Sequence, residues 1–406
     1  MRTAESAPDT AAPAVSGRQL AFILTALTAM GAMSTDLYLP ALPAIADDLA
    51  TSAANAQLTI GLFFAGFAVM QLVCGPLADR YGRRPVLIGG LVIFLLTSAA
   101  CALASTIEIL LLARFGQAFG AACGPVIARA IVRDLYEPRD AGRVLGTIAT
   151  AMALAPLVAP VLGGWLTVAF GWRSNFVLLT LIGVALIAVV IATVPETQRV
   201  RQPDALNPRI MAANFASLLR QPTFVGFSLC VGFASGSLFA WISSSSFVVI
   251  DYFGVPAQHF GLIFGIVILG FALGAFAGSR LTGRFGPARV VGVATHAALV
   301  AALVMLAAGW TGWGGLGLIV AAMAVCFAAA GVTIPQATAG ALGPFPLIAG
   351  TASAALGCWQ MVVAFLVNGA SSLAFDGTPR PMVTIALLCT AGGLLAYHGL
   401  VRRRSS

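Results

Sequence analysis

Two charged residues, Asp36 and Arg114, lie inside stretches of sequence that are otherwise apolar. A charge in hydrocarbon is costly, so an ionisable residue at such a position usually has a function and a partner. Burial penalises the charged form of a carboxyl, which would let Asp36 load and release a proton. Arg114 cannot be deprotonated and needs a partner, a cavity or an anion. These residue types predict proton chemistry at Asp36, with Arg114 as a candidate counter-charge.

Two prolines follow Asp36 at a spacing that interrupts a helix. Pro40 cannot donate the helical hydrogen bond to the Asp36 carbonyl, and Pro43 removes a second bond, to Leu39. We therefore expect a kink just beyond the carboxyl, with polar backbone beside it. The alternative is that Asp36 lies among the outer headgroups, in contact with water.

The two charges are expected at similar depth in the membrane. Asp36 lies six residues outward from the midpoint of its apolar run, or ~9 Å, and Arg114 lies four residues outward, or ~6 Å. Both are displaced toward the periplasm. The depth alone leaves open a functional charge pair, a charge relay or a static structural ion pair.

The elements that must position these residues are membrane helices. Hydrophobic residues make up 59% of the 406 residues, charged residues 9%, and the mean hydropathy is +0.97, which excludes a soluble fold. A membrane-spanning helix needs ~20 mostly apolar residues. Twelve runs qualify, near residues 20–41, 56–76, 86–105, 108–130, 143–168, 173–194, 222–248, 259–279, 288–309, 313–335, 346–372 and 382–401.

The longest gap between runs divides the chain into two halves. This gap, 195–221, holds prolines and six charged residues, and we expect a cytoplasmic loop there. The sequence therefore predicts an all-α membrane protein of twelve transmembrane helices in two six-helix, pseudo-symmetric halves. The expected units are an N-terminal tail (1–18), a first bundle (19–194), the central loop (195–221), a second bundle (222–401) and a C-terminal tail (402–406). An Arg-aromatic-Gly triplet recurs six spans apart, at Arg80–Gly82 and Arg284–Gly286, as expected of an internal repeat.

The basic residues set the expected orientation. All 22 are arginines, and 19 fall in the gaps on the side that carries both termini. Positive residues favour the cytoplasmic side, so we expect both termini inside the cell. The net charge of +8 is thus a signal of membrane topology, and no nucleic-acid partner is expected.

Several function classes lack their sequence signals. The sequence contains no GxxxxGK[ST], GxSxG or HExxH motif, and its seven cysteines form no CxxC pair. We therefore expect no enzyme, no metal and no cofactor other than the proton as coupling ion. A non-transporting membrane sensor stays an alternative, although no loop is long enough for a soluble signalling domain.

The segment from Gly75 to Leu87 resembles the signature loop of the major facilitator superfamily. Further segments resemble the drug/proton antiporter branch with twelve spans, and within it the bicyclomycin/chloramphenicol-resistance exporters. These segments are 36–43, 114–120, 130–136 and 171–173, together with the small residues of the fifth span.

The resemblance implies the major facilitator fold in a bacterial inner membrane and roles for two sets of residues. A conformational latch in the loop after the second span would comprise Gly75, Asp79, Arg80, Gly82, Arg83 and Arg84, with Asp79 pairing with Arg and with a helix N-terminus. The glycines would permit a tight turn. A close-packed antiporter motif would comprise Gly146, Pro160, Gly163 and Gly164.

Aromatic, amide and hydroxyl groups in apolar spans suit a large, weakly polar ligand. The candidate cavity residues are Tyr38, Gln117, Phe239, Trp241, Ser243, Ser244, Trp359 and Gln360. A core or lipid-belt role is the alternative for each aromatic residue.

We expect a monomeric, proton-coupled exporter of small, lipophilic, drug-like molecules that works by alternating access. The interiors of the last six spans carry no charge, which favours neutral substrates. An efflux permease for an amino acid, a sugar or another metabolite is the alternative.

Overall fold

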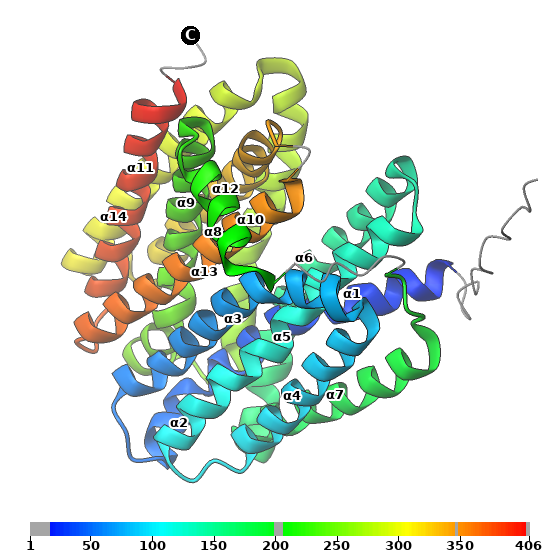
Figure 1. Cartoon of the computed structure of the whole chain (residues 1–406). Coiled ribbons are helices and arrows are strands. Elements are labelled where there is room, and N and C mark those ends of the chain that lie inside the picture. The colour runs from blue at the N-terminus through cyan, green and yellow to red at the C-terminus, as the bar shows by residue number, and fades with distance from the viewer. Residues whose placement is uncertain (1–16, 199–205, 346–347, 403–406) are drawn as a thin grey trace, which may run out of the picture.

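The computed structural model describes residues 17–198, 206–345 and 348–402, and these ranges are almost entirely helical (Figure 1). The first half consists of α1 (Gly17–Asp36), the short α2 (Leu42–Asp48), α3 (Ala53–Tyr81), α4 (Arg83–Ala102), α5 (Ile107–Leu135), α6 (Pro138–Phe170) and α7 (Arg173–Thr193). The second half consists of α9 (Pro222–Ser246), α10 (Ala257–Phe285), α11 (Pro287–Thr311), α12 (Gly315–Leu342), α13 (Ala349–Ala374) and α14 (Arg380–Ala396). Short π-helical turns follow α9 and α14, at Phe247–Tyr252 and Tyr397–Arg402.

These helices have the length and composition of membrane spans. Within the described residues, eleven are long and apolar enough to cross a bilayer, and α6 contributes a further apolar stretch, Ala155–Phe170. The chain is a multi-pass, all-α membrane protein, as predicted. The central gap differs from the expected loop, because it contains a helix, α8 (Pro208–Leu219). Asn207 caps this helix by accepting a hydrogen bond from the amide of Arg209, and Pro208 occupies its first turn.

The predicted kink after Asp36 is confirmed. The α1 helix ends at Asp36, a 3₁₀ turn covers Leu39–Ala41, and α2 begins at Leu42. The missing amide donors at Pro40 and Pro43 explain why the α-helical ladder stops there. The carboxyl that the sequence singles out is therefore the last residue of a broken membrane helix.

The predicted repeat has a structural counterpart at two helix junctions. Gly82 separates α3 from α4 with φ +108°, and Gly286 separates α10 from α11 with φ +79°. Each glycine amide donates to the carbonyl four residues earlier, at Ala78 and Thr282. Both junctions therefore use a glycine in a backbone conformation that residues with a Cβ rarely adopt.

The two ends of the bundle differ in composition. We call the end with Arg80–Arg84, Arg284 and the C-terminal turn the arginine-rich end. The other end, which holds the connections 49–52, 103–106 and 312–314, is the opposite end.

The two halves lie side by side, with α3 packed on α13 and α6 packed on α10 (Figure 1). Near the opposite end α6 and α10 meet backbone to backbone. A Cβ on Gly164 would meet the carbonyl of Ala257, and a Cβ on Gly261 would overlap the backbone at Val161. The halves are thus closed against each other at the opposite end.

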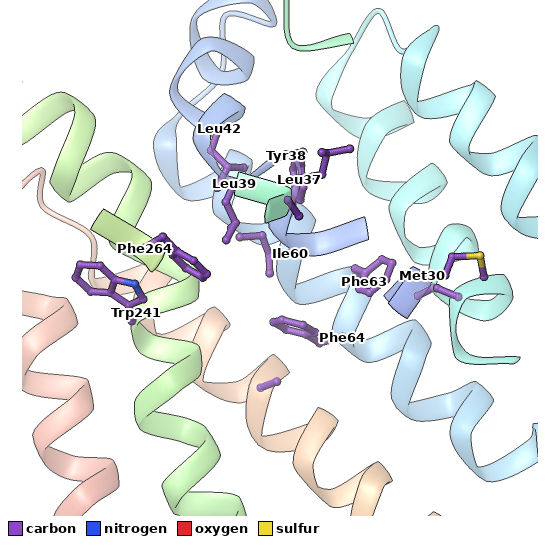
Figure 2. Packing of buried hydrophobic residues seen from close by; sticks show 14 of the residues in the cluster. Met30, Leu37, Tyr38, Leu39, Leu42, Ile60, Phe63, Phe64, Trp241 and Phe264 are labelled. Atoms are coloured by element: carbon purple, nitrogen blue, oxygen red, sulfur yellow. The ribbon is translucent and has the colours of Figure 1, made fainter. Parts of the chain in front are cut away.

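A single hydrophobic cluster crosses the boundary between the halves. It includes Leu39 and Ile60 from the first half and Trp241 and Phe264 from the second half (Figure 2). Burial of these side chains supplies contacts for the region just beyond the break in α1.

Candidate functional site

Arg114 is the centre of a fully buried polar cluster inside the first half. Its side chain is 0% exposed, and its Nη1 donates to the carbonyl of Ser34 at 2.9 Å and to Oε1 of Gln117 at 2.5 Å. The guanidinium carbon lies 4.3 Å from the ring centre of Tyr38 and 4.4 Å from that of Phe63. Aromatic faces attract a cation, most strongly where water is excluded, so these rings supply part of the solvation that Arg114 loses on burial.

The bond to Ser34 ties Arg114 to the broken end of α1. The last carbonyls of a helix lack an amide donor from a following turn. Arg114 supplies a charged donor to one of them, two residues before Asp36. A cation near a helix C-terminus is also favoured by the helix dipole. The guanidinium therefore stabilises the break that precedes the 3₁₀ turn.

Asp36 is buried but does not form an ion pair with Arg114. Its side chain is 5% exposed, and its Oδ1 accepts a hydrogen bond from the hydroxyl of Thr35 at 3.2 Å. Within the described residues, the salt bridges of this structure do not include Asp36 or Arg114. A direct charge pair, one of the sequence-based alternatives, is absent from this conformation, and the two residues are linked through the α1 backbone instead.

Two predicted cavity residues belong to the Arg114 cluster. The hydroxyl of Tyr38 is 2.8 Å from that of Thr59 and donates to it, since the Thr59 hydroxyl itself donates to a backbone carbonyl. Gln117 accepts from Arg114 and donates to Ser98 at 2.7 Å. Both side chains are completely buried. In this conformation they support Arg114.

Three other predicted cavity residues line the boundary between the halves or the face of α9. The ring of Phe239 lies 4.8 Å from that of Phe64, across the boundary. Trp359 donates to the Ser228 carbonyl at 2.9 Å, and Gln360 donates to the Ser235 hydroxyl at 3.1 Å. All three are half-buried. They are neutral groups that a ligand can approach without displacing a charge.

The remaining predicted cavity residues lie near the C-terminus of α9, at the opposite end of the bundle. Trp241, Ser243 and Ser244 are fully buried there, and Ser243 accepts a hydrogen bond from Asn368 of α13. The structure thus separates the predicted cavity residues into three places.

The predicted latch residues occupy two helix ends instead of a loop. Asp79 and Arg80 lie in the last turn of α3, Arg83 and Arg84 begin α4, and Gly82 alone connects the two helices. Gly75 lies within α3, so it makes no turn; a Cβ there would meet open space. The spacing of charges in the sequence predicted a longer loop. The connection is shorter because both helices continue up to Gly82.

A network of charges joins these helix ends to α5. Arg83 bridges Asp79 through Nη1 at 2.5 Å and Asp134 through Nε at 3.1 Å. Asp134 also accepts from the hydroxyl of Thr197 at 3.0 Å. Planar guanidinium groups suit such two-sided pairing with carboxylates. The pairing of Asp79 with an arginine is therefore present, within the first half.

Glu196 is a member of this network that the sequence did not reveal. Its carboxylate accepts from the backbone amides of Arg83 at 2.9 Å and Arg84 at 3.2 Å, which are the first two amides of α4. A carboxylate at a helix N-terminus satisfies free donors and favours the dipole. The helix N-terminus beside Asp79 is thus bound by Glu196, and the only sequence signal is an isolated acid after Pro195 at the end of the sixth span.

Replacing Gly82 with Ala is expected to destabilise this network, whereas Gly75→Ala is its matched control. Gly82 has φ +108°, and a Cβ there would overlap the Glu196 carboxylate. Strain at such a position costs about 1–3 kcal/mol. The melting temperature of the purified protein in detergent should fall for Gly82→Ala and stay equal or rise for Gly75→Ala, because alanine favours a helix interior over glycine. Equal melting temperatures would show that the junction does not depend on this glycine.

The residues of the predicted packing motif in α6 also differ from one another, because three lie close to neighbouring backbone and Gly146 has open space beside it. Gly163 faces the carbonyl of Leu37 so closely that a Cβ would clash, and Gly164 faces α10 as described above. The backbone of Pro160 packs against Gly261. A Cβ at Gly146 would meet open space in this conformation. The close approach of α6 to the broken segment after Asp36 therefore depends on Gly163.

Comparison with known proteins identifies the family. The sequence profile of the Major Facilitator Superfamily matches residues 22–368. The chain belongs to this superfamily. It is a transporter and not an enzyme, which agrees with the absence of catalytic motifs noted above.

Relatives match the superfamily transporter over nearly its whole length. It is 33% identical over 389 residues to the MFS-type transporter YdgK of Bacillus subtilis. The aligned region covers 95% of this chain and 96% of the relative. It is 32% identical to the bicyclomycin resistance protein homolog of Haemophilus influenzae, with 94% and 96% covered. It is 29% identical to multidrug resistance protein D of Escherichia coli, with 93% of each covered. The resemblance to the bicyclomycin-resistance branch, inferred from short motifs, is confirmed.

Solved structures confirm the major facilitator fold. The D-xylose–proton symporter superimposes with a TM-score of 0.74 at 15% identity and covers 95% of this chain and 97% of its own. A bacterial homolog of the human lysosomal transporter Spinster gives a TM-score of 0.73 at 20% identity, with 95% and 98% covered. At these identities the likeness concerns the fold alone.

Proposed function

We propose that this superfamily transporter exports small, mostly hydrophobic drugs from bacteria in exchange for protons. It would act as a monomer in the inner membrane, with both termini in the cytoplasm. The observation that carries drug export is the full-length similarity to relatives named for bicyclomycin and multidrug resistance. The arginine-rich end, by the preference of positive residues for the cytoplasm, would face inward.

The boundary between the halves supports a lipophilic substrate. Phe239 is a half-buried aromatic ring at this boundary, and the nearby half-buried groups that contact α9, Trp359 and Gln360, are also neutral. Binding of a charged metabolite would favour charged side chains at the same place. Sites for large apolar ligands typically combine aromatic surface with a few polar groups.

The position of Asp36 supports proton coupling. Its carboxyl is buried, lacks a cationic partner within 4 Å among the described residues, and ends a helix that breaks at this point. A helix break is a natural place for a change of exposure, because the following 3₁₀ turn carries no continuous ladder. Opening of the halves would bring the carboxyl alternately into contact with the two sides.

A drug-susceptibility panel in a host deleted for its own pumps tests the proposed substrate class. Expression of this chain should raise the inhibitory concentration of several neutral, lipophilic antibiotics, and a chain carrying Asp36→Asn should not. Resistance that is lost when the membrane is uncoupled would support proton drive. Growth protection against amino acids or sugars, without any drug phenotype, would favour the metabolite permease instead.

A further inference from the structure

Asn368 connects the two halves at the opposite end. It lies on α13, is completely buried, and its Nδ2 donates to the carbonyl of Gln57 on α3 at 3.1 Å. The same nitrogen donates to the hydroxyl of Ser243 on α9 at 2.9 Å. One amide therefore holds a helix of the first half against two helices of the second half.

The surface of α3 is shaped to receive this amide. Gly61 lies one turn after Gln57, and a Cβ at Gly61 would overlap the carboxamide oxygen of Asn368. No other residue type leaves that volume empty. The fit between Gly61 and Asn368 brings α13 close enough for the bond to Gln57.

Several polar atoms around this contact are buried without a hydrogen-bond partner. They are both amide atoms of Gln57, Oδ1 of Asn368 and the hydroxyls of Ser245, Ser246 and Ser371. A buried polar group without a partner destabilises the state that contains it by about 1–3 kcal/mol. The unpaired atoms of Gln57 and Asn368, which lie at the contact between α3 and α13, would regain water if the halves separated here. The contact is thus held by neutral hydrogen bonds and opposed by polar groups that favour hydration.

We propose that Gln57, Ser243 and Asn368 form a neutral polar gate that closes the opposite end, the end through which substrate would leave. The gate has no ion pair to break. Its bonds favour the closed state and its unpaired atoms favour the open one, so small changes in free energy can shift the population. The inference rests on the alternating access of the proposed function.

A cysteine cross-link reports the gate without any substrate or proton gradient. The Ser372 hydroxyl donates to the Ala54 backbone carbonyl at 2.6 Å, so these two positions lie close together on facing helices beside the gate, and Ala54→Cys with Ser372→Cys is the reporter pair. In a background without the seven native cysteines, mild oxidation should cross-link the pair rapidly. The rate measures how often this end is closed.

Asn368→Ala in this background should slow cross-linking several-fold, because it removes the bond to Gln57 between the halves together with the bond to Ser243 that holds the amide in position. Gly61→Ala should also slow cross-linking, because the added Cβ would displace the side-chain amide of Asn368 without changing that residue. Ser371→Ala is the matched control, since it removes a buried, unpaired hydroxyl from the same helix and should leave the rate equal or higher. Each variant must elute as a single peak in detergent.

Unchanged cross-linking in both Asn368→Ala and Gly61→Ala would overturn the gate. The proposed function is tested separately, by drug resistance of cells that express the cysteine-pair protein under reducing conditions. If these cells gain no resistance while the variants still alter cross-linking, drug export is wrong and the gate stands. A slower rate in Ser371→Ala equal to that of Asn368→Ala would also contradict the gate, because general loosening of α13 would then explain both.

Discussion

Asp36→Asn is expected to abolish drug export against a gradient while drug binding survives. Asparagine preserves the size of the side chain and its bond from the Thr35 hydroxyl, but it cannot carry a proton. Because the carboxyl is buried at the end of a broken helix, its protonation can be linked to the arrangement of α1. Binding and protonation then influence each other reciprocally, and removal of one proton site removes the linkage.

Proton release from the purified protein on drug addition is the direct measurement. The parent should release protons, and Asp36→Asn should release none at equal drug occupancy. Asp79→Asn is the control, since Asp79 is a partly exposed carboxylate of the arginine-rich end paired with Arg83. Proton release and uphill export that persist in Asp36→Asn would place the coupling carboxyl elsewhere.

The sequence predicted local features of the fold correctly where a single covalent property decides them. The break after Asp36 follows from two prolines without amide hydrogens, and the helices follow from long apolar runs. The glycine at each Arg-aromatic-Gly junction follows from its permitted φ values. Each of these depends on a few neighbouring residues.

Pairings between distant residues were not predictable in the same way. The depths of Asp36 and Arg114 fix their heights in the membrane, but the direction of each side chain around its helix is set by packing. The contact of Glu196 with the first amides of α4 joins residues 113 positions apart. The helix α8 was missed because its charges and prolines suggested a loop, although Asn207 and Pro208 are a usual helix start.

The gate residues illustrate a further limit. Ser243 was predicted from its residue type as part of a ligand cavity, and the structure uses its hydroxyl to accept a bond from Asn368. Gln57 and Asn368 are neutral amides in apolar runs and carry no charge that would have marked them. Their role emerges only from the approach of α3 to α13, which depends on Gly61.

Arg114→Lys is expected to remove most export activity and to lower the melting temperature, although it keeps the charge. The guanidinium lies over the rings of Tyr38 and Phe63 and donates from one nitrogen to both the Ser34 carbonyl and Gln117. A desolvated cation–π contact contributes about 2 kcal/mol, and a hydrogen bond to a charged group about 1.5–3 kcal/mol. An ammonium group lacks the plane that lies over the two rings while a terminal nitrogen donates both hydrogen bonds.

Drug binding and proton release distinguish a coupling role of Arg114 from a role in stability alone. Since Arg114 holds the end of α1 two residues before Asp36, its loss should impair drug binding and proton release together, whereas Asp36→Asn impairs proton release alone. Arg209→Lys, an exposed arginine on α8, is the matched control and should change neither. Binding isotherms and proton release measured on Arg114→Lys decide the question. If that variant melts earlier yet binds drug and releases protons as the parent does at low temperature, Arg114 serves stability and the end of α1 does not transmit coupling.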